Sequence, residues 1–82
     1  MDSQEALVAI RRAIRTTLDG KEVAITPETD LIEDKVLDSL DSMVFLMELS
    51  QHTGIEFPDS DPVEAGLFKV SILIDFMVAN AK

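Results

Sequence analysis

The chain has 82 residues and contains no cysteine, no tryptophan and no tyrosine. Without cysteine it can form neither a disulfide nor a thiolate metal site, which fits a reducing compartment. Long apolar runs are also missing: none approaches the ~20 residues that a membrane-spanning helix needs. The N-terminus lacks the basic and then apolar pattern of a signal peptide. We therefore expect a cytoplasmic protein without a membrane span.

Positive charge is scarce. Seven lysines and arginines stand against 16 acidic residues, for a net charge of −9. The stretch from Glu28 to Glu64 holds eleven acids and one lysine, whereas the arginines gather near the N-terminus. An acidic surface repels nucleic acid and anionic membranes and attracts basic protein patches. Solubility alone is the alternative explanation of this charge.

Hydrophobic spacing predicts an all-α domain that fills residues 1–82. We expect helices over Ser3–Asp19, Ser39–Thr53 and Lys69–Asn80, with one short helical turn between Asp59 and Leu67. Ser3 is a candidate cap for the first helix. The predicted fold is a four-helix bundle of three main helices and one short one, with a long loop between the first and second helices.

Each helix has a set of apolar residues that could face the core. The predicted core residues are Leu7, Ile10, Ile14 and Leu18 with Val8 beside them in the first helix, Leu40, Met43, Val44, Met47 and Leu49 with Phe45 and Leu46 in the second, and Val70, Leu73, Ile74, Phe76 and Met77 in the last. The long loop also holds apolar residues, which predicts that it is pinned across the bundle: Val23, Ile25, Leu31, Ile32, Val36 and Leu37.

Asp38-Ser39-Leu40 is the tripeptide at the start of the second predicted helix. The Ser39 hydroxyl could cap that helix by accepting a bond from a backbone amide. The same position could instead hold a phosphate, because a helix start offers free amides and a partial positive charge. His52 is the chain's one histidine and lies thirteen residues further along, so about 20 Å away on one helix. A serine–histidine pair within the chain is therefore excluded, and we expect no enzymatic activity.

The acidic stretches do not match a calcium-binding loop. Counted from Asp30, an EF-hand would need an oxygen ligand where Ile32 stands and a glycine where Lys35 stands. Counting from Asp59 fails in the same way, so no metal site is predicted. His52 is expected to be a surface or capping residue. Met43 and Met47 are expected to fill the core or line a groove.

The sequence resembles the acyl carrier protein family over nearly its whole length. The centre of the resemblance is L-D-S-L-D-S at 37–42, which is similar to the family's Asp-Ser-Leu motif. Three flanking segments support it: I-T-P-E-T-D-L at 25–31, G-I-E-F-P-D at 54–59 and I-D-F-M at 74–77.

This resemblance implies that Ser39 carries 4′-phosphopantetheine, attached by a separate phosphopantetheinyl transferase from coenzyme A. The arm's terminal thiol would hold acyl or aminoacyl groups as thioesters and pass them between ligase or synthase enzymes with basic or mixed docking patches. The protein would act as a monomeric carrier and not as an enzyme. Partner enzymes would read a surface that comprises Asp38, Leu40, Asp41, Met43, Val44 and Glu48.

Some positions depart from the pattern of housekeeping fatty-acid carriers. Val36 stands where those carriers usually have glycine, and Val44, Ser50 and Gln51 stand where they usually have glutamates. We expect Val44 and Phe45 to give a more apolar docking face. These departures predict a specialised carrier in a lipid, polyketide or peptide-type pathway. An unmodified helical adaptor with a carrier-like fold is the alternative.

Overall fold

The computed structural model describes residues 1–57 and 66–81. Within these residues the chain forms three helices, α1 (Ser3–Thr17), α2 (Ser39–Thr53) and α3 (Val70–Asn80), and no strand. The prediction of an all-α domain with three main helices is thereby confirmed. The predicted short helix at 59–67 falls mostly outside the described residues, and its last two described positions lie in a turn.

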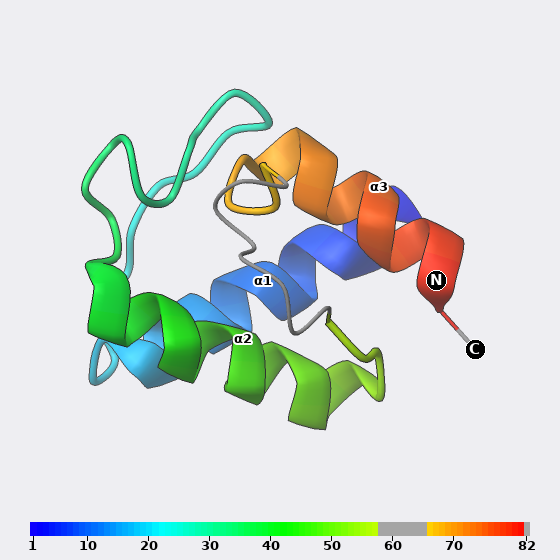
Figure 1. Cartoon of the computed structure of the whole chain (residues 1–82), viewed down its shortest axis with the longest axis horizontal. Coiled ribbons are helices and arrows are strands. Elements are labelled where there is room, and N and C mark those ends of the chain that lie inside the picture. Colours follow the sequence, from blue (N-terminus) through cyan, green and yellow to red (C-terminus); the bar gives the residue numbers. More distant parts are fainter. Residues whose placement is uncertain (58–65, 82) are drawn as a thin grey trace.

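α1 is the central helix. It packs against both α2 and α3, and Figure 1 shows it running between the green α2 and the orange-to-red α3. None of the three helices combines the length and the apolar character needed to cross a membrane. Side chains from all three helices and from the long loop are buried together in one core, which comprises Ala6, Ile10, Ala13, Ile14, Ile25, Leu31, Leu37, Phe45, Leu49, Ile55, Phe68, Val70, Leu73 and Met77.

The cap of α1 is Asp2, so the prediction of a Ser3 cap is wrong. The Glu5 amide donates to the Asp2 carboxylate at 2.8 Å, and the Asp2 amide donates back to the Glu5 carboxylate at 3.3 Å. This reciprocal pair is a capping box, which satisfies two amides that the helix itself leaves free. The helix ends at Thr17, two residues earlier than predicted.

The buried face of α1 is narrower than the apolar pattern predicts. Ile10 and Ile14 are buried as expected, whereas Leu7 and Leu18 are half-buried and Val8 is exposed. Two small residues that the pattern did not single out, Ala6 and Ala13, are buried as well. The arginines lie on the exposed face, as predicted.

α2 buries a different face from the predicted one. Only Ser42, Phe45 and Leu49 are buried. The prediction that Leu40, Met43, Val44 and Met47 form the core face is wrong, since these side chains are 70%, 68%, 39% and 57% exposed. Phe45 was expected on a docking face, but it is fully buried, with its ring centroid 6.5 Å from that of Phe68. Phe45 therefore anchors α2, and the methionines face outward.

The long loop between α1 and α2 is pinned, as its apolar residues predict. Ile25, Leu31 and Leu37 are buried, and Val23, Ile32 and Val36 are half-buried. Backbone bonds also join the loop to the start of α3, where the Val70 amide donates to the Thr29 carbonyl at 2.9 Å and the Ser71 amide to the Pro27 carbonyl at 3.0 Å.

These two bonds have a structural role, because Lys69, which precedes α3, offers no side-chain cap. Loop carbonyls thus satisfy amides that the helix start leaves free. α3 begins at Val70, one residue after the predicted start. It buries Val70, Leu73 and Met77, as predicted, while Ile74 and Phe76 are half-buried.

Candidate functional site

The last turn of the loop fixes where α2 begins. The Asp30 carboxylate accepts bonds from the amides of Ile32 and Glu33, both at 2.9 Å, and so holds a tight turn. The Leu37 amide then donates to the Leu31 carbonyl at 2.8 Å, and both of these leucines are buried. These bonds hold the end of the loop in place. Asp38, which follows Leu37 and is the first residue of the candidate site, therefore lies at the surface in a fixed position.

Asp38, and not Ser39, is the cap of α2. Its carboxylate accepts from the Asp41 amide at 2.7 Å, and its carbonyl accepts from the Ser42 amide at 2.9 Å. Ser39 is consequently the first helical residue. The possibility that the Ser39 hydroxyl caps the helix is thus excluded, because the preceding carboxylate already fills that role.

The two serines at the start of α2 differ in their surroundings. Ser39 is exposed, and within the described residues its hydroxyl makes no hydrogen bond. Ser42 is 7% exposed, and its hydroxyl donates to the Ser39 carbonyl at 2.7 Å. Because a buried hydroxyl that is already bonded is both unreachable and occupied, Ser39 is the hydroxyl of this pair that another molecule can reach.

The start of α2 also offers backbone donors. The first amides of any helix lack intrahelical acceptors, and here the cap bond uses the amide of Asp41. The amides of Ser39 and Leu40 have no acceptor among the described residues. They lie beside the Ser39 hydroxyl, so an anionic group attached there would meet two donors and the positive end of the helix dipole. The Asp38 carboxylate would oppose part of that attraction.

The cap bond predicts a measurable effect on stability. Asp38→Ala should lower the free energy of unfolding by about 1 kcal/mol, because it leaves the Asp41 amide without its acceptor. Asp38→Asn is the matched control, since an asparagine oxygen can accept the same bond and should retain most of the stability. Urea unfolding followed by circular dichroism measures both. Equal stability of all three proteins would contradict the role of Asp38 as the cap.

Four exposed apolar side chains continue from Ser39 along the outside of α2. Each of them lies three or four residues from two of the others, so they form one row on a helix. We call this row the outer stripe; its members are Leu40, Met43, Val44 and Met47. The sequence interpretation assigned Met47 to the core and so missed it as a surface residue. Its spacing of seven from Leu40 and four from Met43 is the signal that could have placed it.

The remaining predicted site residues lie around this stripe. Asp38 is exposed, while Asp41 and Glu48 are half-buried on one flank. The Glu48 carboxylate lies 3.6 Å from Nε2 of His52, which is an exposed residue near the end of the helix, as predicted. The structure thus gathers all six predicted recognition residues on α2 and the residue before it.

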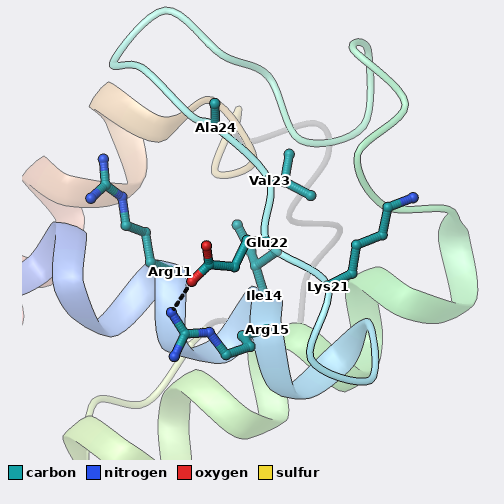
Figure 2. Close-up of a pocket in the computed structure, with 7 residues that line it drawn as sticks. All are labelled: Arg11, Ile14, Arg15, Lys21, Glu22, Val23 and Ala24. Atoms are coloured by element: carbon teal, nitrogen blue, oxygen red, sulfur yellow. Dashed lines mark hydrogen bonds and ion pairs between the residues drawn. The ribbon is translucent and has the colours of Figure 1, made fainter.

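Two surface hollows lie away from this site. One, of about 300 Å³, is bordered by Arg11, Arg15 and Lys21. In Figure 2 the Arg15 guanidinium meets the Glu22 carboxylate, at 2.7 Å, and Lys21 is turned away from that pair. The other, of about 570 Å³, lies between the start of α1 and His52. Ser39 lines neither of these two hollows.

Comparison with known proteins gives a consistent result. The family profile described as phosphopantetheine attachment site matches residues 8–65. The acyl carrier protein of Rubrobacter xylanophilus is 33% identical over 80 residues, which cover 98% of this chain and 96% of the relative. The acyl carrier protein of Thermosynechococcus vestitus is 30% identical over 77 residues, 94% and 93% of the two chains.

No solved structure matches the chain. Both sequence comparisons extend over most of the chain and include the Asp-Ser-Leu segment at the start of α2. The chain therefore belongs to the acyl carrier protein family: it is a carrier and not an enzyme, and its cofactor is 4′-phosphopantetheine held covalently on a serine.

Proposed function

We propose that Ser39 is the serine that carries the phosphopantetheine arm. The observation that supports this most directly is the contrast between the two serines of the motif. The Ser39 hydroxyl is exposed and has no partner among the described residues, whereas the Ser42 hydroxyl is buried and bonded to a carbonyl. The free amides of Ser39 and Leu40 suit a phosphate at this position.

The chain's own contribution to attachment is to present a hydroxyl. His52 lies thirteen residues along the same helix, about 20 Å away, so the chain offers no histidine base to Ser39. We therefore expect the transferase, and not a histidine of this chain, to take the proton that leaves the hydroxyl. Once bound, the arm supplies a terminal thiol that can hold a cargo as a thioester, which a chain without cysteine cannot do by itself.

We further propose that the outer stripe is where the transferase docks. The stripe begins at Leu40, next to the hydroxyl that the enzyme must reach, and Asp41 and Glu48 flank it. A complementary partner would present an apolar groove with basic residues at one edge. Helix faces with anchors at spacings of three, four and seven residues are a common way to fill such a groove.

The composition of α2 favours a role in a specialised pathway. Val44 is exposed on the docking side, and the neutral Ser50 and Gln51 follow it on α2. A general fatty-acid carrier would be expected to present several glutamates there. We therefore propose that a dedicated ligase or synthase, with a more apolar docking surface, loads an acyl or aminoacyl cargo onto this carrier.

The proposed function is tested by supplying the purified protein with coenzyme A, magnesium and a transferase of broad specificity. One arm per chain should be added, which intact mass spectrometry measures. Protein isolated from its host should already carry the arm, and some of it should carry a cargo that hydroxylamine releases. An adaptor that is never modified would gain no mass in vitro and would carry no arm in the host.

Charge and apolar contact at the stripe predict different salt responses. Glu48→Gln should lower kcat/KM for transfer a few-fold at low salt and have little effect at high salt, because salt screens the lost attraction. Val44→Ser should lower it about two- to fivefold at both, because apolar contact is not screened. Rates at two ionic strengths measure this. If neither variant changes kcat/KM, the transferase does not dock on the stripe.

A further inference from the structure

The methionines of the chain fall into two classes. Met43 and Met47 are 68% and 57% exposed, lie one helical turn apart and both belong to the outer stripe. Met77 is fully buried in the core, and Met1 is exposed at the start of the chain. The two methionines most open to solvent therefore both lie on the proposed docking surface.

A thioether suits such a surface because it is apolar and polarisable. The same sulfur is also a site of chemical modification. Hydrogen peroxide transfers one oxygen atom to the sulfur: the peroxide O–O bond breaks, a sulfur–oxygen bond forms, and water leaves. The sulfur is oxidised by two electrons and the peroxide is reduced by two. The product, methionine sulfoxide, is polar, and sulfoxide reductases can return it to methionine.

We propose that Met43 and Met47 form a redox-sensitive site, at which peroxide oxidation weakens docking on the outer stripe and reduction restores it. The inference rests on the proposed function, because the consequence requires that partners dock on α2. A sulfoxide that is buried in an apolar groove loses its hydrogen bonds to water and gains no hydrogen-bond donor in return. Oxidation should therefore lower kcat/KM for transfer of the arm to Ser39 by about fivefold or more.

The fold should survive this modification. Neither sulfur belongs to the core, whereas Met77 does and is shielded by it. Mild oxidation should thus leave the helical content and the unfolding midpoint of the protein nearly unchanged. Oxidation of a buried methionine would disrupt packing and lower the unfolding midpoint. An unchanged midpoint therefore shows that a lower transfer rate arises from weaker docking and not from loss of structure.

The test treats the full chain with dilute hydrogen peroxide and maps each methionine by peptide mass spectrometry. Met43 and Met47 should gain oxygen before Met77. The rate of arm transfer should fall and should recover after treatment with methionine sulfoxide reductases. The control is the double variant M43L/M47L, which keeps Met1 and Met77. Whatever its own rate, that rate should be the same before and after peroxide.

Three outcomes overturn the inference. The first is oxidation of Met77 ahead of the other two, and the second is oxidation of Met43 and Met47 with no change in rate. The third is an equal loss of rate in the double variant, which would place the sensitive group elsewhere. Failure of the untreated protein to accept the arm at all would contradict the proposed function instead, so the two failures can be told apart.

Discussion

Replacing Ser39 with alanine should abolish attachment of the phosphopantetheine arm, with no mass gain under conditions that convert the unsubstituted protein completely. On the proposed assignment the arm is bonded to the Ser39 hydroxyl oxygen, so removing that oxygen leaves nothing to modify. The loss should not arise from unfolding. Ser39 is exposed, the helix cap is provided by Asp38, and alanine is well suited to a helix. Circular dichroism and an unfolding curve check this point.

Ser42→Ala is the matched control for this prediction. It removes a second hydroxyl from the same turn of α2, one that is buried and donates to the Ser39 carbonyl at 2.7 Å. The variant should lose about 1 kcal/mol of stability, because the hydrogen bond is lost. It should still gain one arm per chain. If Ser42→Ala lost the arm and Ser39→Ala kept it, the assignment of the two serines would be reversed.

Replacing Phe45 with alanine should destabilise the protein severely. Phe45 is fully buried and packs near Phe68, with their ring planes tilted by 47°. Truncating a buried phenylalanine typically costs about 3–5 kcal/mol. A domain of 82 residues has a total stability of about 4–12 kcal/mol, so the loss is a large fraction of it. Urea unfolding or thermal melting followed by circular dichroism measures the change.

Met43→Ala on the same helix provides the comparison. Met43 lies outside the core, so its truncation should change the free energy of unfolding by no more than about 0.5 kcal/mol. The pair of variants therefore measures which face of α2 is buried. A larger loss from Met43→Ala than from Phe45→Ala would mean that α2 is rotated about its axis from the orientation described above.

That orientation is the feature the sequence could not predict. Residues 43–47 are all apolar, so the pattern along α2 gives no contrast between an inner and an outer face. Each possible face contained enough hydrophobic residues to look like a core. α1 is different, because arginines alternate with its apolar residues and mark the exposed side. Its buried Ile10 and Ile14 were correctly predicted for that reason.

The two helix caps were misplaced by one residue for a shared reason. An Asp-Ser pair stands at the start of both helices, and serine was the candidate cap considered in each, with phosphate attachment as the other possibility at Ser39. In the structure the capping residue is the aspartate in both helices, Asp2 in α1 and Asp38 in α2. For α1 the signal was available in the spacing, because Glu5 stands three residues after Asp2, as a capping box requires. At Asp2 that box is complete, with Glu5 as its second member.

The pinned loop was predictable only in part. Its apolar side chains indicated that it would be held against the bundle, and three of them are buried. Its role in capping α3 has no side-chain signature, because the acceptors are the backbone carbonyls of Pro27 and Thr29. The position of Ser39 could be read from its motif, but the difference between its hydroxyl and that of Ser42 needed the structure.

Locating the arm on the modified chain shows whether Ser39 is the attachment residue. After transfer from coenzyme A, the protein is digested and the peptide that spans the start of α2 is fragmented in the mass spectrometer. The added mass should lie on Ser39, and Ser42 should be unmodified. An arm found on Ser42 or on any other residue would contradict this assignment, as would a chain that carries no arm.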